Sequence, residues 1–176
     1  VDKRGAAIQA ASSGNPWLKY VEYKERLSHW QAKRVGVENS DGDVLLFLDA
    51  HVVPSKGAIS GMFKCYRSFY YSGFGSIHLP LTYKILEWRR LIYKFVLDGN
   101  YYYRYAFTGF PEQKKPMTPF EVPCMSTCGM MIKRSIYEEI GGWPKGLGIY
   151  GGGENFMNYT LAVCGYKKFI YPHGTL

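Results

Sequence analysis

The sequence lacks any uninterrupted hydrophobic run that approaches the roughly 20 residues needed to cross a membrane, so we expect no transmembrane segment in this chain. Internal repeats and low-complexity segments are also absent. Hydrophobic residues make up 47% of the chain and charged residues 20%, which is typical of a folded protein rather than a disordered one. A chain of 176 residues fits one domain with a sizeable core.

Paired Cys-x-x-Cys spacing is missing too, which argues against a structural zinc site. The cysteines are Cys65, Cys124, Cys128 and Cys164, and their neighbours are mostly apolar. This pattern predicts reduced cysteines in the core, which favours a cytoplasmic protein.

Dense clusters of basic residues are also missing, although the formal net charge is +8. The cations occur as scattered pairs, such as Arg89-Arg90 and Lys167-Lys168. A basic surface can offset a bound diphosphate or attract a nucleic acid. A solvated basic surface without a polyanionic partner is the simpler interpretation.

What the sequence does contain is an apolar block that ends in metal-ligand residues, Asp43-Val-Leu-Leu-Phe-Leu-Asp-Ala-His51. Its short length predicts a strand over Val44–Leu48. Its nearly continuous hydrophobicity predicts that both faces of this strand are covered. Asp49 and His51 follow the strand and share one side of an extended chain, so they can converge on one divalent ion such as Mn²⁺ or Mg²⁺. The alternative is an ordinary turn at Asp49 with His51 merely nearby.

A second candidate lies behind a glycine-rich stretch. Glu154 stands at the start of a predicted helix, where a carboxylate is electrostatically favoured. From there it could act as a base or hold a substrate hydroxyl. The alternative is a first-turn acid that only stabilises the helix.

The chain as a whole alternates between strand and helix patterns, which predicts an α/β fold with a mixed sheet. The predicted strands are Trp17–Tyr23, Val44–Leu48, Gly75–Leu79, Tyr101–Phe107, Cys128–Lys133 and Lys167–Tyr171, and the predicted helices are Glu25–Glu38, Ser55–Phe69, Arg134–Ile140 and Glu154–Cys164.

Four segments in this order resemble GT-A glycosyltransferases of family 2 and the related polypeptide N-acetylgalactosaminyltransferases. They are residues 31–43, Leu48-Asp49-Ala50-His51, residues 128–143, and Gly152-Gly153-Glu154-Asn155. The second is similar to the family's Asp-x-Asp or Asp-x-His motif, and the fourth to its Gly-Gly-Glu-Asn element. The resemblance implies a Rossmann-like, mostly parallel mixed sheet flanked by helices.

The resemblance also implies a single catalytic domain over residues 1–176. Val1-Asp2 looks like the end of a strand that other members have in full, so we expect the domain to be N-terminally incomplete and to lack its first strand.

The activity that the resemblance implies is metal-dependent transfer of a sugar from a nucleotide-diphosphate sugar, in particular a UDP-sugar, to an acceptor hydroxyl. His173 would be a third metal ligand beside Asp49 and His51. Glu154 would bind the acceptor hydroxyl. The implied donor-site residues are Asp2 at the nucleotide, Asp49, Ala50, Gly152 and Gly153 within the two motifs, and Thr127, Cys128 and Gly129 around the sugar.

One departure from the family concerns the catalytic residues. Many members have Glu-Asp where this chain has Glu154-Asn155, so inversion and retention of the sugar's configuration both stay open. The acceptor is also open, and it could be a glycan, a protein, a lipid carrier or a nucleic acid. The proline-rich loop Phe110–Pro119 would carry acceptor specificity in this family, or it is a plain surface excursion.

Two other functions remain compatible with these residues. The chain could be a non-catalytic carbohydrate- or nucleic-acid-binding module on the same scaffold, since fold does not fix function. It could also be a nucleotidyltransferase, whose related sheet binds nucleotides.

Overall fold

The computed structural model describes residues 5–22, 28–69, 73–82, 90–97, 103–109, 117–147 and 152–176. Its five-stranded sheet has the order β1 (Val44–Phe47), β7 (Met130–Lys133), β2 (Phe74–His78), β8 (Lys167–Ile170) and β6 (Phe120–Val122). A second sheet is formed by β3 (Leu81–Thr82), β4 (Arg90–Leu97) and β5 (Tyr103–Gly109). The helices are α1 (Gly5–Ser12), α2 (His29–Glu38), α3 (Ala58–Ser68), α4 (Arg134–Glu139) and α5 (Gly153–Val163).

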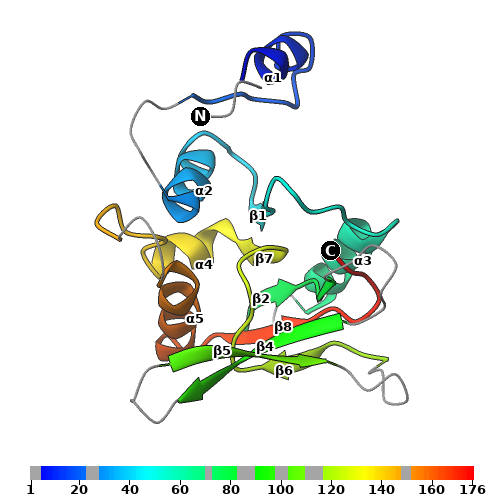
Figure 1. The fold of residues 1–176 in the computed structure, drawn as a ribbon, viewed down its shortest axis with the longest axis vertical. Coiled ribbons are helices and arrows are strands. Elements are labelled where there is room, and N and C mark those ends of the chain that lie inside the picture. Colours follow the sequence, from blue (N-terminus) through cyan, green and yellow to red (C-terminus); the bar gives the residue numbers. More distant parts are fainter. Residues whose placement is uncertain are drawn as a thin grey trace.

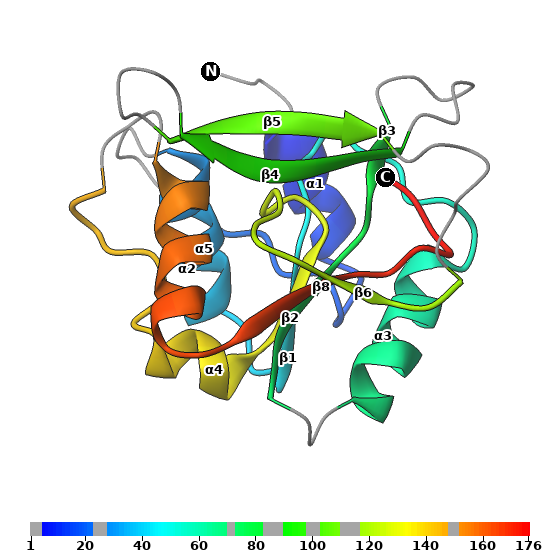
Figure 2. The same ribbon diagram turned by 90° about the horizontal axis from the view of Figure 1, so that it is seen from below.

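Helices cover both faces of the five-stranded sheet. Helices α2, α4 and α5 lie on one side and α3 on the other (Figure 1, Figure 2). Leu45 and Phe47 of β1 enter the core on the first side, while Val44 and Leu46 pack against the core on the second. The prediction of a β1 strand covered on both faces is therefore confirmed, and so is the α/β fold class with its mixed sheet.

The balance of strand directions is less parallel than expected. β2 and β8 are parallel neighbours, whereas β1–β7, β7–β2 and β8–β6 are antiparallel. Strands β1, β2 and β8 nevertheless run in the same direction, so their carboxyl ends meet at one edge. A single row crosses the sheet near that edge, made of Phe47, Met130, His78, Ile170 and Phe120.

Most of the predicted elements appear with small shifts of their ends, but the predicted strand over Trp17–Tyr23 is wrong for residues 17–22. The chain turns there, with the Trp17 amide donating to Asn15 Oδ1 at 3.0 Å, and the Trp17 side chain is 94% exposed. A side chain so exposed has no sheet face to pack against. The α1 helix and strands β3, β4 and β6 were not predicted.

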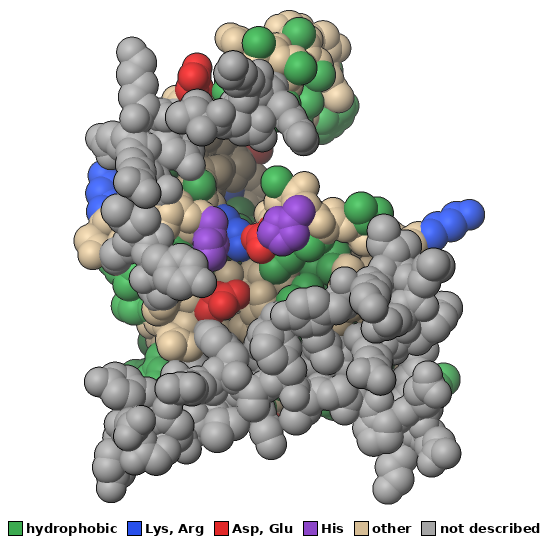
Figure 3. Space-filling view, viewed as in Figure 1, with side chains coloured by type: hydrophobic (Ala, Val, Ile, Leu, Met, Phe, Trp, Pro, Cys, Tyr) green, Lys and Arg blue, Asp and Glu red, His purple; other side chains and the backbone are tan. Residues whose placement is uncertain are grey.

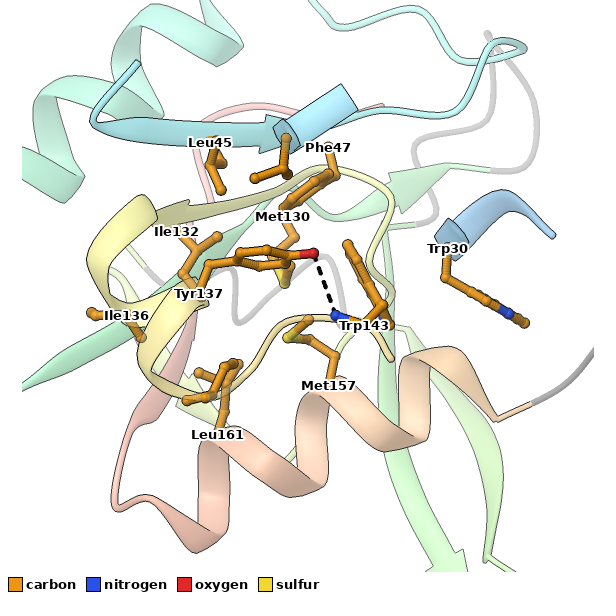
Figure 4. Packing of buried hydrophobic residues seen from close by; sticks show 12 residues of the cluster. Trp30, Leu45, Phe47, Met130, Ile132, Ile136, Tyr137, Trp143, Met157 and Leu161 are labelled. Carbon is orange, nitrogen blue, oxygen red and sulfur yellow. Dashed lines mark hydrogen bonds between the residues drawn. The ribbon is translucent and has the colours of Figure 1, made fainter. Parts of the chain in front are cut away.

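The first core is centred on Trp143, which follows α4 and is completely buried (Figure 4). Its indole meets the ring of Phe47 edge to face, with the centroids 4.9 Å apart. Its backbone amide donates to Tyr137 Oη at 3.3 Å, and its Nε1 donates to the carbonyl of Gly153 at 2.9 Å. Trp143 thus joins β1, α4 and the start of α5.

Helix α2 is tied to the segment that follows Trp143. The Gln31 side chain accepts from the Ser28 amide at 2.8 Å, which satisfies one free donor at the start of the helix. Its Nε2 donates to the carbonyls of Lys145 at 2.8 Å and Leu147 at 3.1 Å. One side chain therefore holds both the helix start and the chain that leads toward α5.

Gly153 allows α5 to lie against α2. A Cβ built there would come within 2.2 to 2.8 Å of three atoms of the Trp30 indole. We expect Gly153→Ala to destabilise the fold by about 1–3 kcal/mol, because Trp30 is buried and cannot move away freely. Urea denaturation would measure this loss. Gly146→Ala is the matched control, since nothing lies within 4 Å of its added methyl; equal stability of the two variants would contradict the expected clash.

Candidate functional site

The shared strand edge brings together the two candidate segments. Asp49 and His51 follow β1, and residues 126–129 precede β7, which pairs with β1. The Gly129 amide donates to the carbonyl of Phe47 at 2.7 Å, which fixes the segment before β7 against the end of β1. The 126–129 segment, which includes the residues expected around the sugar, therefore lies beside the end of β1.

Asp49 is held by a lysine that the sequence reading did not single out. Lys33 Nζ lies 2.9 Å from Asp49 Oδ1, with the two side chains 9% and 30% exposed. Burial alone would raise the pKa of Asp49, but the hydrogen bond and charge of Lys33 outweigh it, helped by His29 and His51, so the pKa is lowered. The carboxylate is thus fixed in its charged form.

His29 also lines the groove at this site, although it belongs to none of the sequence motifs. It lies one helical turn before Lys33 on α2. Burial and the charge of Lys33 lower the pKa of His29, while Asp49 and Glu154 act in the opposite direction. A helical i, i+4 pair that faces a strand-end acid is the sequence signal that could have revealed both residues.

Glu154 reaches back from the first turn of α5 to the same edge. Its Oε1 accepts from Ser126 Oγ at 2.8 Å and from the Thr127 amide at 3.2 Å. Among the described residues no donor contacts Oε2, so one carboxylate oxygen is fixed and the other is available. A first-turn acid that only stabilised its own helix would need neither contact.

Two hollows meet at Asp49 and His51. One is a cleft of about 630 Å³ that is also lined by Ser126, Cys128 and Glu154 and by apolar residues such as Leu81. The other is a groove of about 710 Å³ between α2 and β1, lined by His29 and Lys33 among others. Figure 3 shows histidine, lysine and acidic side chains gathered in a hollow on this face. Cationic and anionic groups here suit a ligand that carries both phosphate and hydroxyl groups.

The three loop residues that were expected around the sugar have different environments. Cys128 lines the cleft, and burial raises the pKa of its thiol. Thr127 is completely buried, with Oγ1 3.4 Å from Lys33 Nζ. Gly129 has φ +78 and packs against Leu176 and Leu79. It therefore faces the core and does not line the cleft.

The glycine-rich motif is also divided between roles. Gly152 precedes α5 with φ +86 and is exposed, whereas Gly153 packs on Trp30. Ala50 is exposed and lines the groove. Asn155 Oδ1 is buried and has no hydrogen-bond partner among the described residues. Asp2 and residues 110–116 of the proline-rich loop lie outside the described residues.

The expected metal triad is not assembled. His173 follows β8, and its Nε2 lies 2.8 Å from the carbonyl oxygen of Met117, with the ring packed against Tyr171. Within the described part of the chain, no three His, Cys, Asp or Glu side chains are arranged to hold a metal ion. Asp49 and His51 still offer an oxygen and a nitrogen beside the cleft, a donor pair that fits Mn²⁺ if the ligand itself supplies further oxygens.

His78 lies in the interior near this edge and is completely buried. Burial lowers its pKa to about 3 from the ordinary 6.5, outweighing the hydrogen bond to the Ser126 carbonyl, and Lys168 acts in the same direction as burial. The imidazole is therefore neutral at neutral pH.

This shift predicts a loss of stability in mild acid. Between pH 6.5 and pH 3 the unfolded chain binds a proton on His78 that the folded chain does not, so stability falls as the pH falls through this window. From pH 7 to pH 5 we expect about 2 kcal/mol less unfolding free energy from this group. Urea denaturation at both pH values would measure it. His78→Asn should lose less between the two pH values, and an equal loss in both proteins would contradict the assignment.

Cys65, Cys128 and Cys164 form no disulfide with another described residue. In the described part of the chain, every helix is too short or too polar to span a membrane. Cys124 and Cys128 are buried as predicted, and Cys65 is half-buried. Cys164 is exposed, because it follows the last turn of α5, so the prediction of a core position is wrong for this residue.

A cleft that holds charged side chains beyond the strand ends of an α/β sheet is where this class of fold binds its ligands. The sequence matches the glycosyl transferase family 2 over residues 2–141, and the chain belongs to that family. The resemblance to family 2 is therefore confirmed.

Relatives point to one branch of sugar transferases. The chain is 26% identical to the probable N-acetylgalactosaminyltransferase 6 of Caenorhabditis elegans, over 88% of this chain and 26% of that protein. It is 25% identical to the inactive polypeptide N-acetylgalactosaminyltransferase-like protein 5 of Mus musculus, over 88% of this chain and 37% of that protein. The crystal structure of GalNAc-T7 with UDP, GalNAc and Mn²⁺ superposes with a TM-score of 0.74 at 19% identity, covering 99% of this chain and 34% of that one. The chain thus spans between 26% and 37% of the length of these proteins. The structural match confirms the GT-A fold.

Proposed function

We propose that this chain forms the catalytic part of a metal-dependent glycosyltransferase that moves a sugar from a UDP-sugar to an acceptor hydroxyl. The observation that carries the proposal is the shared cleft. Asp49 and His51 line it from the end of β1, and Glu154 lines it from the start of α5. An ion-binding pair and a hydroxyl-binding acid therefore face one space.

The donor side of this reaction must neutralise a diphosphate. Asp49 and His51 would hold Mn²⁺, which supplies Lewis-acid stabilisation of the leaving diphosphate when it is bound. Lys33 adds a fixed positive charge on the groove side of Asp49. The GalNAc-T7 structure with UDP, GalNAc and Mn²⁺ supports a UDP-sugar, with UDP-N-acetylgalactosamine as the first donor to test.

The acceptor side depends on Glu154. Ser126 and Thr127 fix its Oε1, so Oε2 can accept a hydrogen bond from an acceptor hydroxyl. In an inverting reaction Glu154 would take the hydroxyl proton as a base, and in a retaining reaction it would only orient the hydroxyl. Asn155 follows directly and carries no carboxylate for this purpose.

A non-catalytic binding module remains the second candidate. Two observations favour it: one relative is named as inactive, and the Lys33 ammonium already neutralises Asp49. Such a module would bind a carbohydrate or a nucleic acid without releasing UDP.

Nucleotide release from a panel of UDP- and GDP-sugars separates the two candidates. The full-length protein would be assayed with Mn²⁺, with Mg²⁺ and with EDTA. Metal-dependent release of UDP from one donor supports the transferase. No release from a folded, metal-loaded sample would favour the binding module.

A further inference from the structure

His78 lies at the end of β2 with both ring nitrogens engaged. Nδ1 lies 3.0 Å from the carbonyl oxygen of Ser126, and Nε2 lies 2.8 Å from Ser76 Oγ. A carbonyl oxygen can only accept a hydrogen bond, so Nδ1 of the neutral ring carries the proton. Nε2 must then accept the hydroxyl proton of Ser76. The ring therefore has one tautomer, and it donates toward the Ser126 backbone.

Ser126, whose carbonyl is held by His78, in turn contacts Glu154 through its side chain. The Cys128 amide donates to Ser126 Oγ at 3.1 Å, so the hydroxyl proton of Ser126 is available for Glu154 Oε1 at 2.8 Å. The Thr127 amide adds a second donor to the same oxygen. Any rotation of this short turn would move both donors away from Oε1 together.

We propose that His78 is a positioning residue for Glu154, acting through the backbone of Ser126. It holds the 126–128 turn so that two donors fix Oε1 and leave Oε2 for the acceptor hydroxyl. The inference deepens the proposed function and rests on it, because Glu154 is taken there as the residue that binds the acceptor.

The surroundings of His78 support this role over simple filling of the core. Burying an imidazole costs more than burying an aliphatic side chain unless both nitrogens are paired, as they are here. Met125, which precedes this turn, is also held by hydrogen bonds from a buried polar side chain. The Asn158 side chain pairs with both the amide and the carbonyl of Met125 and donates to the carbonyl of Glu154. The turn is thus held to the sheet by His78 and to α5 by Asn158.

The test compares UDP release from UDP-N-acetylgalactosamine with Mn²⁺ in four variants. Ser126→Ala and His78→Leu should each lower kcat by roughly tenfold or more, with the donor KM changed less than about twofold. His78→Asn keeps a donor close to the position of Nδ1 and should stay within about threefold of the wild type. Ser68→Ala, on the exposed end of α3, is the serine control and should match the wild type.

A double-mutant cycle separates positioning from general damage. In a Glu154→Gln background, Ser126→Ala and His78→Leu should each change the residual rate by less than about twofold, because the group that they position is already lost. Damage to the fold would instead lower the rate further in both backgrounds.

Hydrogen–deuterium exchange of a peptide covering residues 124–129 gives a readout that needs no activity. The amides of Thr127 and Cys128 both donate within this network, so His78→Leu should speed their exchange, and His78→Asn should do so much less. This measurement also remains interpretable if His78→Leu folds poorly, because His78→Asn and Ser126→Ala are compared with it.

The outcomes are distinct. Wild-type kcat in both His78→Leu and Ser126→Ala, with a strong loss in Glu154→Gln, overturns the inference and leaves the proposed function standing. If the wild type releases no UDP, the proposed function fails, and the exchange data alone judge the His78 contact. Exchange in His78→Leu equal to that of the wild type would then overturn it.

Discussion

Asp49→Ala is expected to lower UDP release at least about a thousandfold, because it removes the carboxylate that would hold the metal at the diphosphate. The same change should weaken binding of Mn²⁺ with UDP. Calorimetric titration with UDP and Mn²⁺, run beside the release assay, would measure both effects. A variant that released UDP at the wild-type rate would remove Asp49 from the metal site.

The fold must be shown to survive this change. Asp49→Ala leaves the Lys33 ammonium without its 2.9 Å partner in a place where Lys33 is only 9% exposed. Part of any stability loss would then come from the unpaired lysine. Lys33→Met in the same background removes that charge, so stability should recover while UDP release stays lost. Recovery of UDP release in the double variant would instead show that the unpaired lysine caused the defect.

Glu154→Gln is expected to lose most turnover, by roughly a hundredfold or more, while donor binding stays close to normal. Glutamine keeps an oxygen that can accept from Ser126 Oγ and the Thr127 amide, so the start of α5 should be undisturbed. The second position becomes an NH₂ group, which cannot accept a hydroxyl proton. Steady-state kinetics with varied donor and varied acceptor would separate kcat from the donor KM.

Glu38→Gln is the matched control for this prediction. Glu38 lies on α2, and its side chain is 49% exposed. Among the described residues, its ion-pair partner is Arg34. Its turnover should equal that of the wild type, since exposed helix pairs of this kind contribute little. If Glu154→Gln behaved like Glu38→Gln, Glu154 would be only a first-turn helix acid.

Local sequence patterns were sufficient to predict the elements that carry the site. The apolar block of Val44–Leu48 and the acid at the start of α5 both follow from periodicity and punctuation. Their meeting also follows once β1 and β8 are placed in one direction, because α5 leads into β8 and therefore starts at the edge where β1 ends. What local patterns could not show is the partner of each group, such as Lys33 on Asp49 or Ser126 on Glu154, because those contacts depend on the packing of α2 and on the turn before β7.

Two predicted site residues have contacts in the structure that the sequence did not predict. The motif containing Gly153 suggested a donor-site glycine, yet the approach of the Trp30 ring is what requires glycine there. His173 was expected at the metal, but its ring lies at the Met117 carbonyl. Both positions are decided by neighbours far away in the sequence, which no local pattern records. The sequence did not distinguish a surface from a core position for His78, and its tautomer follows only from the three-dimensional contacts.

The hydrogen bonds from Gln31 to the carbonyls of Lys145 and Leu147 couple α2 to the segment after Trp143. Helix α2 carries Lys33 at the Asp49 side of the cleft and, through Gln31, the chain that leads to Glu154 at the other side. Because Trp30 of the same helix also packs against Gly153 at the start of α5, a ligand that displaced α2 would be expected to shift Lys33 and Glu154 together.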